Sequence, residues 1–218
     1  MRDAAAAIVL AGGAGRRLAA AAPPGGKPWV EFGGRTSLER VTSAVAAETA
    51  RVIVVAAPKQ PLPPLAPAVE IVRDTAPGSG PLAGLRDGLA LLLAGPAAPP
   101  RAVVVASCDV PLVRRGLVRL LLEFLLADGG DWAVPVVDGH PQVLLSAMRP
   151  SLAARIEARL AAGLRDVRGL LADPAVAWRP VPESLVRTVD PGLESFLDVD
   201  TPADVDAIRA GKIPPSSA

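Results

Sequence analysis

Apolar runs of strand length alternate along this chain with stretches that have helical periodicity. The apolar runs cover residues 5–12, 51–57, 69–74 and 101–109. The stretches of helical periodicity cover residues 36–50, 80–95 and 114–130. Such alternation is typical of a mostly parallel sheet with helices on both faces. The order of these segments therefore predicts an α/β protein, a three-layer Rossmann-like sheet.

The second half of the chain departs from this simple alternation. WAVPVVDG and PQVLLSAM, residues 132–139 and 141–148, predict a pair of strands, and residues 151–163 predict an amphipathic helix. The last segment with a recognisable pattern is FLDVDTPADVDAIRAG, residues 196–211. With 218 residues, half of them apolar, the chain is long enough for one well-filled domain. We expect a single domain over 1–210 and a frayed tail over 211–218.

Charge and composition exclude several classes of function. The 23 basic and 22 acidic residues leave a net charge of +1, and aromatic residues make up 3%, so we expect no nucleic-acid binding. No apolar run is long enough to span a membrane, and Gly12-Gly13 with Arg16-Arg17 interrupt the N-terminal apolar run, which therefore predicts a strand and not a signal peptide. Cys108, the single cysteine, cannot form an internal disulfide, which agrees with a cytoplasmic location. We expect it in the core.

The stretch IVLAGGAGRR, residues 8–17, brings an apolar run directly into a glycine-rich loop. Glycine lets a backbone come close to a ligand, because it has no side chain and few conformational limits. The loop is a candidate cradle for an anion. It matches neither a Walker A motif nor a complete G-x-G-x-x-G, and a simple tight turn is the alternative interpretation.

Other polar residues follow the apolar runs, where the carboxyl ends of parallel strands would meet and ligands collect. Those that carry charge are Arg17, Lys27, Asp74, Asp109, Asp198 and Asp200. Cations and loop amides suit the phosphates of a nucleoside triphosphate, and carboxylates suit Mg²⁺. Taken singly, the aspartates could cap turns and the cations could be solvated. Their joint occurrence at successive strand ends favours a nucleotide site.

These residues carry a family resemblance. LAGGAGRRL resembles the L-A-G-G-x-S-x-R-M signature of the MobA-like nucleotidyltransferases, and matching segments continue in family order through VVVASCDVPLV to FLDVDTPADV. The resemblance implies a sheet of the nucleotide-diphospho-sugar transferase type. It also implies an enzyme that uses Mg²⁺ and transfers GMP from GTP to the phosphate of molybdopterin, the organic part of the molybdenum cofactor, with release of pyrophosphate. The implied partners are GTP, molybdopterin, and proteins that deliver and receive the cofactor.

The resemblance also implies roles for individual residues. The residues implied to bind the nucleotide are Leu10, Ala11, Gly12, Gly13, Lys27, Asp74 and Asp109. Those implied to be catalytic are Arg17, Lys27 and Asp109. The metal falls to Asp109 and Asp200, with Asp198 as the alternative to Asp200. On the acceptor side we expect His140-Pro141 and the segment 163–169 with Arg165 and Arg168, because a phosphate favours arginine partners.

The chain departs from the family pattern at Gly15, where serine is usual, and at Gly26, where aspartate is usual. An asparagine that some members carry after the second strand is absent from VVAAPK. GPLAGL resembles the guanylyl branch, whereas DVDTP is close to the D-I-D-T-P of related cytidylyltransferases. A cytidylyltransferase of the same pathway, a transferase for another small phosphate, and a non-catalytic nucleotide-binding module therefore stay open.

Overall fold

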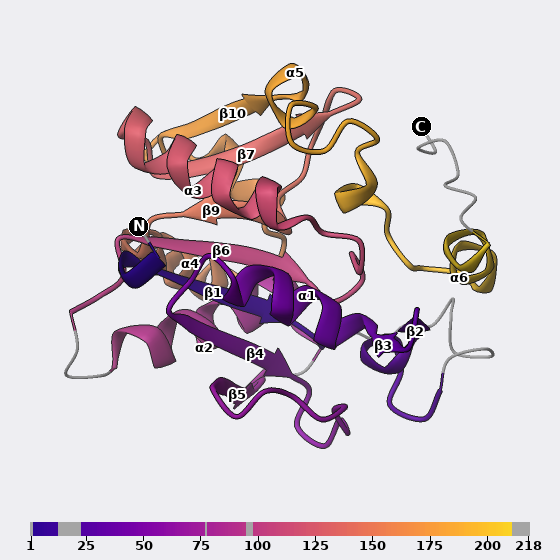
Figure 1. Ribbon diagram of the computed structural model, residues 1–218. Helices are drawn as coiled ribbons and strands as arrows, with labels where there is room; N and C mark the ends of the chain where they lie inside the picture. The colour runs from indigo at the N-terminus through magenta and orange to yellow at the C-terminus, as the bar shows by residue number, and fades with distance from the viewer. Residues whose placement is uncertain (1, 13–22, 77, 95–97, 211–218) are drawn as a thin grey trace.

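The computed structural model of the chain describes residues 2–12, 23–76, 78–94 and 98–210, and it centres on one eight-stranded sheet (Figure 1). The strands are β1 (Ala5–Leu10), β4 (Arg51–Ala56), β5 (Val69–Arg73), β6 (Ala102–Ser107), β7 (Trp132–Val137), β8 (His140–Pro141), β9 (Leu145–Met148) and β10 (Trp178–Pro182). They lie in the order β10-β7-β9-β6-β1-β4-β5, and β8 pairs with β7. A separate two-stranded ribbon consists of β2 (Glu31–Phe32) and β3 (Arg35–Thr36).

The sheet is mostly parallel, as the sequence predicts. β1 lies between β4 and β6 and is parallel to both, and β4–β5 and β10–β7 are also parallel pairs. β9 is antiparallel to β6 and to β7. The predicted strand pair is therefore confirmed, although its second run is divided into β8 and β9.

Helices cover both faces of the sheet. The helices are α1 (Ser37–Ala46), α2 (Pro81–Leu93), α3 (Arg115–Asp128), α4 (Ala153–Ala161), α5 (Glu183–Val186) and α6 (Pro202–Arg209). Short 3₁₀ helices cover Arg2–Ala4, Lys27–Trp29, Pro150–Leu152, Arg168–Ala172 and Glu194–Phe196. The predicted helices are present with slightly shorter bounds. A capping box between Thr36 and Glu39 begins α1, and Gly129 in the left-handed region ends α3.

The two cores follow from the alternation of side chains along β1. Ala5, Ala7 and Val9 pack with α1 and α3, whereas Ala6, Ile8 and Leu10 pack with α2 and α4 on the other face. All six β1 residues are buried, as expected for a strand covered on both faces. Helix α2 approaches β1 so closely that a Cβ on Gly88 would lie 2.8 Å from a methyl carbon of Ile8.

The edge strand β10 has no counterpart in the sequence prediction. Its WRPVP contains Pro180 and Pro182, which cannot donate a backbone hydrogen bond and so weaken the strand pattern. At an edge only one side of a strand needs donors, and β10 pairs with β7 alone.

The C-terminal helix α6 lies beside the β2–β3 ribbon (Figure 1). Val30, Phe32, Val199 and Val205 form a small apolar cluster that joins them. Asp204 completes a capping box with Thr201 at the start of α6. The tail expected over 211–218 lies outside the described residues.

No helix in the part of the chain described here is long and apolar enough to cross a membrane.

Candidate active site

The ends of β1 and β6 bring two predicted site segments side by side. Leu10 is the register partner of Ser107, and the amide of Cys108 donates to the carbonyl of Leu10 at 3.0 Å. Ala11 continues from β1 with its amide on the carbonyl of Val55 at 2.8 Å. The start of the glycine-rich loop and the segment before Asp109 therefore emerge together from the centre of the sheet.

The backbone around Asp109 is fixed by contacts from other elements. The hydroxyl of Ser37 donates to the carbonyl of Cys108, and the amide of Val199 donates to the carbonyl of Asp109 at 2.8 Å. Two residues further on, Arg40 Nε donates to the carbonyl of Pro111 at 2.9 Å. The Asp109 carboxylate is thus presented by a stiff segment.

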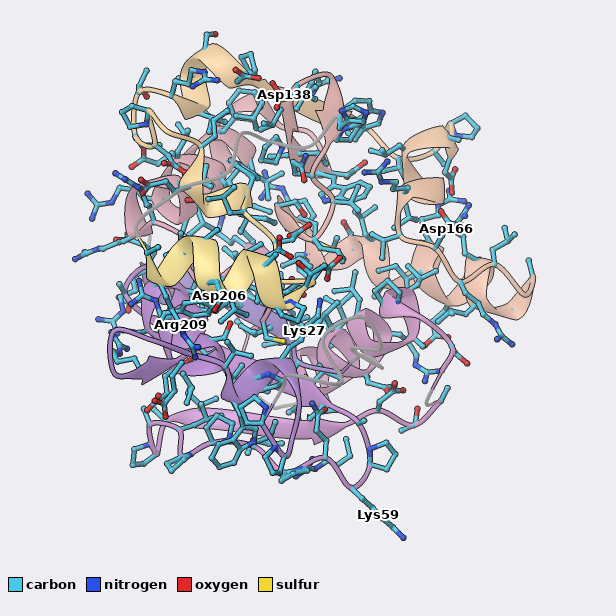
Figure 2. The ribbon with its side chains drawn as sticks, turned by 90° about the vertical axis from the view of Figure 1, so that its right-hand side faces the viewer. Lys27, Lys59, Asp138, Asp166, Asp206 and Arg209 are labelled. Atoms are coloured by element: carbon cyan, nitrogen blue, oxygen red, sulfur yellow. The ribbon has the colours of Figure 1, made fainter. Side chains whose placement is uncertain are left out.

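Lys27 joins Asp109 to the late aspartate segment. Its Nζ lies 3.4 Å from Asp109 Oδ2 and also makes a hydrogen-bonded ion pair with Asp200. Figure 2 shows the molecule from the right-hand side of Figure 1, the side toward which β1 and β4 point. In this view Lys27 lies near the centre, beside α6. Residues far apart in the sequence therefore meet in one charged cluster.

The backbone conformation at Gly26 accounts for glycine at a position where the family usually has aspartate. Its φ of +78° lies in the left-handed region, which glycine adopts easily and a residue with a side chain does not. Gly25 before it has φ +107°, and a Cβ there would overlap the ring of Trp29. The turn that carries Lys27 into the cluster is built on these two glycines.

The charges of the cluster perturb one another. Burial lowers the pKa of Lys27, but the hydrogen bond to Asp200 and the charges of Asp109 and Asp200 outweigh burial and raise the pKa above its usual value. Partial loss of solvation, together with the charges of Asp109 and Asp200, raises the pKa of Asp198 to about 7, while Lys27 acts in the opposite direction. Negative charge is therefore in excess here, and a cation would relieve it.

The residues present fit a divalent metal bound together with a triphosphate. Asp109 Oδ1 is buried and has no hydrogen-bond partner among the described residues, and an oxygen in that state gains from a cation. The described ranges contain no group of three or more Asp, Glu, His or Cys side chains placed to hold a metal by themselves. Mg²⁺ is usually held by one or two carboxylates with water and substrate phosphates, so Asp109 and Asp200 would suffice.

A pocket of about 180 Å³ opens beside Asp109. Polar residues that line it are Ser107, Asp109, Gln142, Arg168 and Asp198. Of the residues expected on the acceptor side, Pro141 and Arg168 line this pocket, whereas His140 and Arg165 do not. Instead, the carbonyl of Arg165 lies against Gly80, where a Cβ would come within 3.0 Å of it.

Asp74 has a local role that the sequence left open as an alternative. Its carboxylate accepts the amide of Ala76 at 2.8 Å, which closes a turn after β5. β5 lies at the edge of the sheet opposite β10, with β4 and β1 between it and β6. Gly13 and Arg17, predicted for the nucleotide loop and for catalysis, lie outside the described residues.

Cys108 is a core residue, as expected. It is 4% exposed, and burial raises the pKa of its thiol, so it is not available as a thiolate nucleophile.

The sequence prediction missed Gln60. Its Oε1 accepts the amide of Ala57 at 3.1 Å, and its Nε2 donates to the carbonyls of Ala11 and Gly25 at 3.0 and 3.5 Å. One side chain thereby joins the backbone after β1 to the turn before Lys27. Nothing in the local sequence APKQP indicates this role, because all three partners are backbone groups.

Comparison with known proteins identifies the family. The MobA-like NTP transferase domain matches residues 7–176. A probable molybdenum cofactor guanylyltransferase of Mycobacterium avium (strain 104) is 32% identical over 180 residues, which are 83% of this chain and 84% of that relative.

Solved structures agree in fold. The molybdopterin-guanine dinucleotide biosynthesis protein A of Archaeoglobus fulgidus has a TM-score of 0.73 at 23% identity and covers 94% of this chain and 97% of its own. Rv0371C of Mycobacterium tuberculosis H37Rv, solved in complex with manganese, has a TM-score of 0.63 at 17% identity and covers 94% and 98%. These likenesses confirm the predicted Rossmann-like sheet of the nucleotide-diphospho-sugar transferase type. Because the domain match covers most of the sequence and the relative is similar over most of both lengths, this chain belongs to the MobA-like NTP transferase family and is a nucleotidyltransferase.

Proposed function

We propose that this protein is a molybdenum cofactor guanylyltransferase, which transfers GMP from GTP to the phosphate of molybdopterin and releases pyrophosphate. The observation that carries the proposal is the cluster at the carboxyl ends of the central strands. There Lys27 is held between Asp109 and Asp200, and Asp109 keeps one buried oxygen without a partner. The similarity to a probable guanylyltransferase supports the choice of substrates.

The proposed metal is Mg²⁺, held by Asp109 and Asp200. Mg²⁺ supplies positive charge that neutralises the phosphates and the charge that develops on the departing pyrophosphate. Asp109 is well suited to hold it because its backbone is fixed by Ser37 and Val199. A carboxylate on a stiff segment loses little conformational entropy when it binds.

Lys27 is proposed to bind the phosphates of the nucleotide. Its pKa is raised, so its ammonium stays charged at neutral pH and can stabilise negative charge on the leaving group. The ion pairs with Asp109 and Asp200 orient it before the nucleotide arrives. Arg17 is proposed as a second cation on the same phosphates, from the family resemblance alone.

The attack itself needs no general base from the protein, because the acceptor phosphate is already anionic. Positioning and charge stabilisation then account for the rate. Leu10, Ala11, Gly12 and Gly13 are proposed to surround the nucleotide, and Asp74 to lie near it.

The pocket beside Asp109 is proposed to receive the phosphate end of the acceptor. Arg168 lines it together with Ser107 and Gln142, so a cation and two hydrogen-bonding groups are available to a phosphate. Asp109 lines the same pocket and also contacts Lys27, so a phosphate placed there is adjacent to the proposed nucleotide site. This adjacency is what a direct transfer requires.

GTP and molybdopterin are the proposed small-molecule partners, and the protein is proposed to work in the cytoplasm with proteins that deliver the cofactor and receive the product.

Release of pyrophosphate from the purified protein tests this function. The assay combines Mg²⁺ and molybdopterin with GTP, CTP, ATP or UTP in parallel, and replaces molybdopterin with a sugar phosphate as the matched acceptor control. Release that requires GTP and molybdopterin together is expected. A requirement for CTP would instead assign a cytidylyltransferase, release with the sugar phosphate would assign another acceptor, and GTP binding without turnover would assign a non-catalytic module.

A further inference from the structure

A buried carboxylate that the proposed chemistry does not use lies just before the late aspartate segment. Asp190 is 0% exposed. Its two oxygens accept the amides of Glu194 and Ser195 at 3.2 and 2.8 Å, and Oδ1 lies 3.1 Å from Arg114 Nε. Every contact of this carboxylate joins the turn 190–195 to itself or to the start of α3.

A second contact joins the same two segments. The backbone amide of Arg114, the residue before α3, donates to the hydroxyl of Ser195 at 3.0 Å. Ser195 is also 0% exposed. We call Asp190, Arg114 and Ser195 the Asp190 latch. Its side-chain and backbone contacts leave the turn little freedom to move relative to α3.

The latch lies between the segments that carry the site carboxylates. Arg114 follows Asp109 by five residues, and Ser195 precedes Asp198 and Asp200 by three and five residues. Beyond the latch the segments meet again, where the amide of Val199 donates to the carbonyl of Asp109 at 2.8 Å. The two carboxylate-bearing segments are therefore joined at two points, and Asp109 and Asp198, one from each segment, line the same pocket.

The turn does not hold this shape through backbone preference alone. Leu193 has φ +54°, in the left-handed region that a leucine rarely adopts, and yet it is buried at 8% exposure. Its amide donates to the carbonyl of Asp190 at 3.0 Å. The conformation is thus maintained by contacts, and the one between Asp190 and the amide of Ser195 is buried.

A buried ion pair is a poor source of stability, because desolvation offsets most of its attraction and apolar side chains of equal volume often stabilise as well or better. In some proteins such a pair instead defines a geometry. We propose that Asp190 is a positioning residue, and that the Asp190 latch fixes the Asp198–Asp200 segment opposite Asp109 so that Asp200 and Asp109 reach the same metal and phosphates. This inference rests on the proposed function of those aspartates.

The test compares Asp190→Asn and Ser195→Ala with Glu48→Gln. Glu48 is a matched control, because it is also a buried carboxylate, at 4% exposure, and it pairs with Arg115 and Arg119 of the same helix α3. It lies in the segment between α1 and β4, which holds none of the proposed nucleotide, metal or acceptor residues. Any general effect of losing a buried ion pair on α3 should appear in the control as well.

The first readout is hydrogen exchange by NMR on the protein without ligands. The amide of Val199 reports the late segment, and the amide of Cys108, bonded to Leu10 at 3.0 Å, reports the central sheet. We expect Asp190→Asn to speed exchange at Val199 relative to Cys108 by about tenfold, as local opening does. Glu48→Gln should leave this ratio unchanged.

The second readout is the Mg²⁺ concentration that gives half-maximal pyrophosphate release from GTP and molybdopterin. We expect Asp190→Asn to raise it about tenfold, the low end of the effect of groups that orient metal ligands, and Ser195→Ala to raise it less. If both latch variants match Glu48→Gln in both readouts, the latch is structural and the inference is wrong. If the wild-type protein shows no turnover, the proposed function fails, while the exchange ratio still decides whether the latch holds the segment.

Discussion

The substitution Asp109→Asn separates a metal-binding role from a structural one. Asparagine keeps the size of the side chain and removes its charge. If Asp109 holds Mg²⁺ and orients Lys27, we expect turnover at saturating Mg²⁺ to fall at least about a hundredfold, which corresponds to roughly 2.7 kcal/mol of transition-state stabilisation.

The structure predicts a much smaller effect on folding. At the 3.4 Å between Lys27 Nζ and Asp109 Oδ2, the gross attraction of two unit charges is about 5 kcal/mol for an effective dielectric near 20. Desolvation of both groups offsets most of this attraction, and Lys27 keeps its ion pair with Asp200 in the variant. The amide of asparagine, like the carboxylate, still places one polar atom at the buried position of Asp109 Oδ1, so this contribution to stability changes little. We therefore expect the melting temperature without metal to change by no more than about 4 °C.

The assay measures pyrophosphate release and thermal unfolding for Asp109→Asn and for the control Asp131→Asn. Asp131 precedes β7 and its carboxylate accepts the amide of Ala177 at 3.0 Å, so it is a comparable aspartate whose contact joins the chain before β7 to the chain before β10. The control should keep its turnover. Near-normal turnover in Asp109→Asn would refute the metal role, and a large loss of melting temperature would show that Asp109 acts through the fold.

Further substitutions and ligands test the other parts of the site. Lys27→Met leaves Asp109 and Asp200 without their shared cation, so we expect it to cost roughly 2–4 kcal/mol of transition-state stabilisation and to lower the melting temperature measured in EDTA. Mg²⁺ should restore part of the melting temperature; no restoration by Mg²⁺ would contradict the shared site. Arg168→Ala should raise the KM for molybdopterin about tenfold or more and leave the KM for GTP unchanged, because Arg168 lines the acceptor pocket; the exposed Arg155→Ala is its control, and a change in the KM for GTP alone would reverse the assignment. Calorimetry should give a Kd for GTP at least about tenfold below that for CTP, a difference that one or two buried hydrogen bonds to the base supply; equal affinities would contradict guanine specificity.

Local sequence patterns predict the centre of this fold well. β1 and β6 are continuous apolar runs, and such runs are typical of strands covered on both faces. The capping box at Thr36 and the glycine after α3 mark helix ends through chemistry that acts within a few residues. β10 escaped prediction because its prolines are tolerated only at an edge, and edge position is a property of the whole sheet.

The meeting of Lys27, Asp109 and Asp200 in one cluster was predictable, because these residues follow strands or match a family motif, whereas their roles stay a prediction. The contacts that hold these residues were not. Gln60, Ser37 and Asp190 act through backbone groups that are distant in sequence, and no periodicity or motif indicates such partners. Asp74 shows the converse, because its position after a strand suits either a ligand or a turn, and the structure supplies the turn contact.

The fate of the GTP phosphates tests the central claim most directly. GTP labelled at the α-phosphate or at the γ-phosphate is incubated with the protein, Mg²⁺ and molybdopterin, and the products are separated. Transfer of GMP predicts that the α-label moves to the molybdopterin product and that the γ-label is found in pyrophosphate. Transfer of the γ-label to the acceptor, or release of free phosphate with no labelled acceptor, would contradict nucleotidyl transfer at this site.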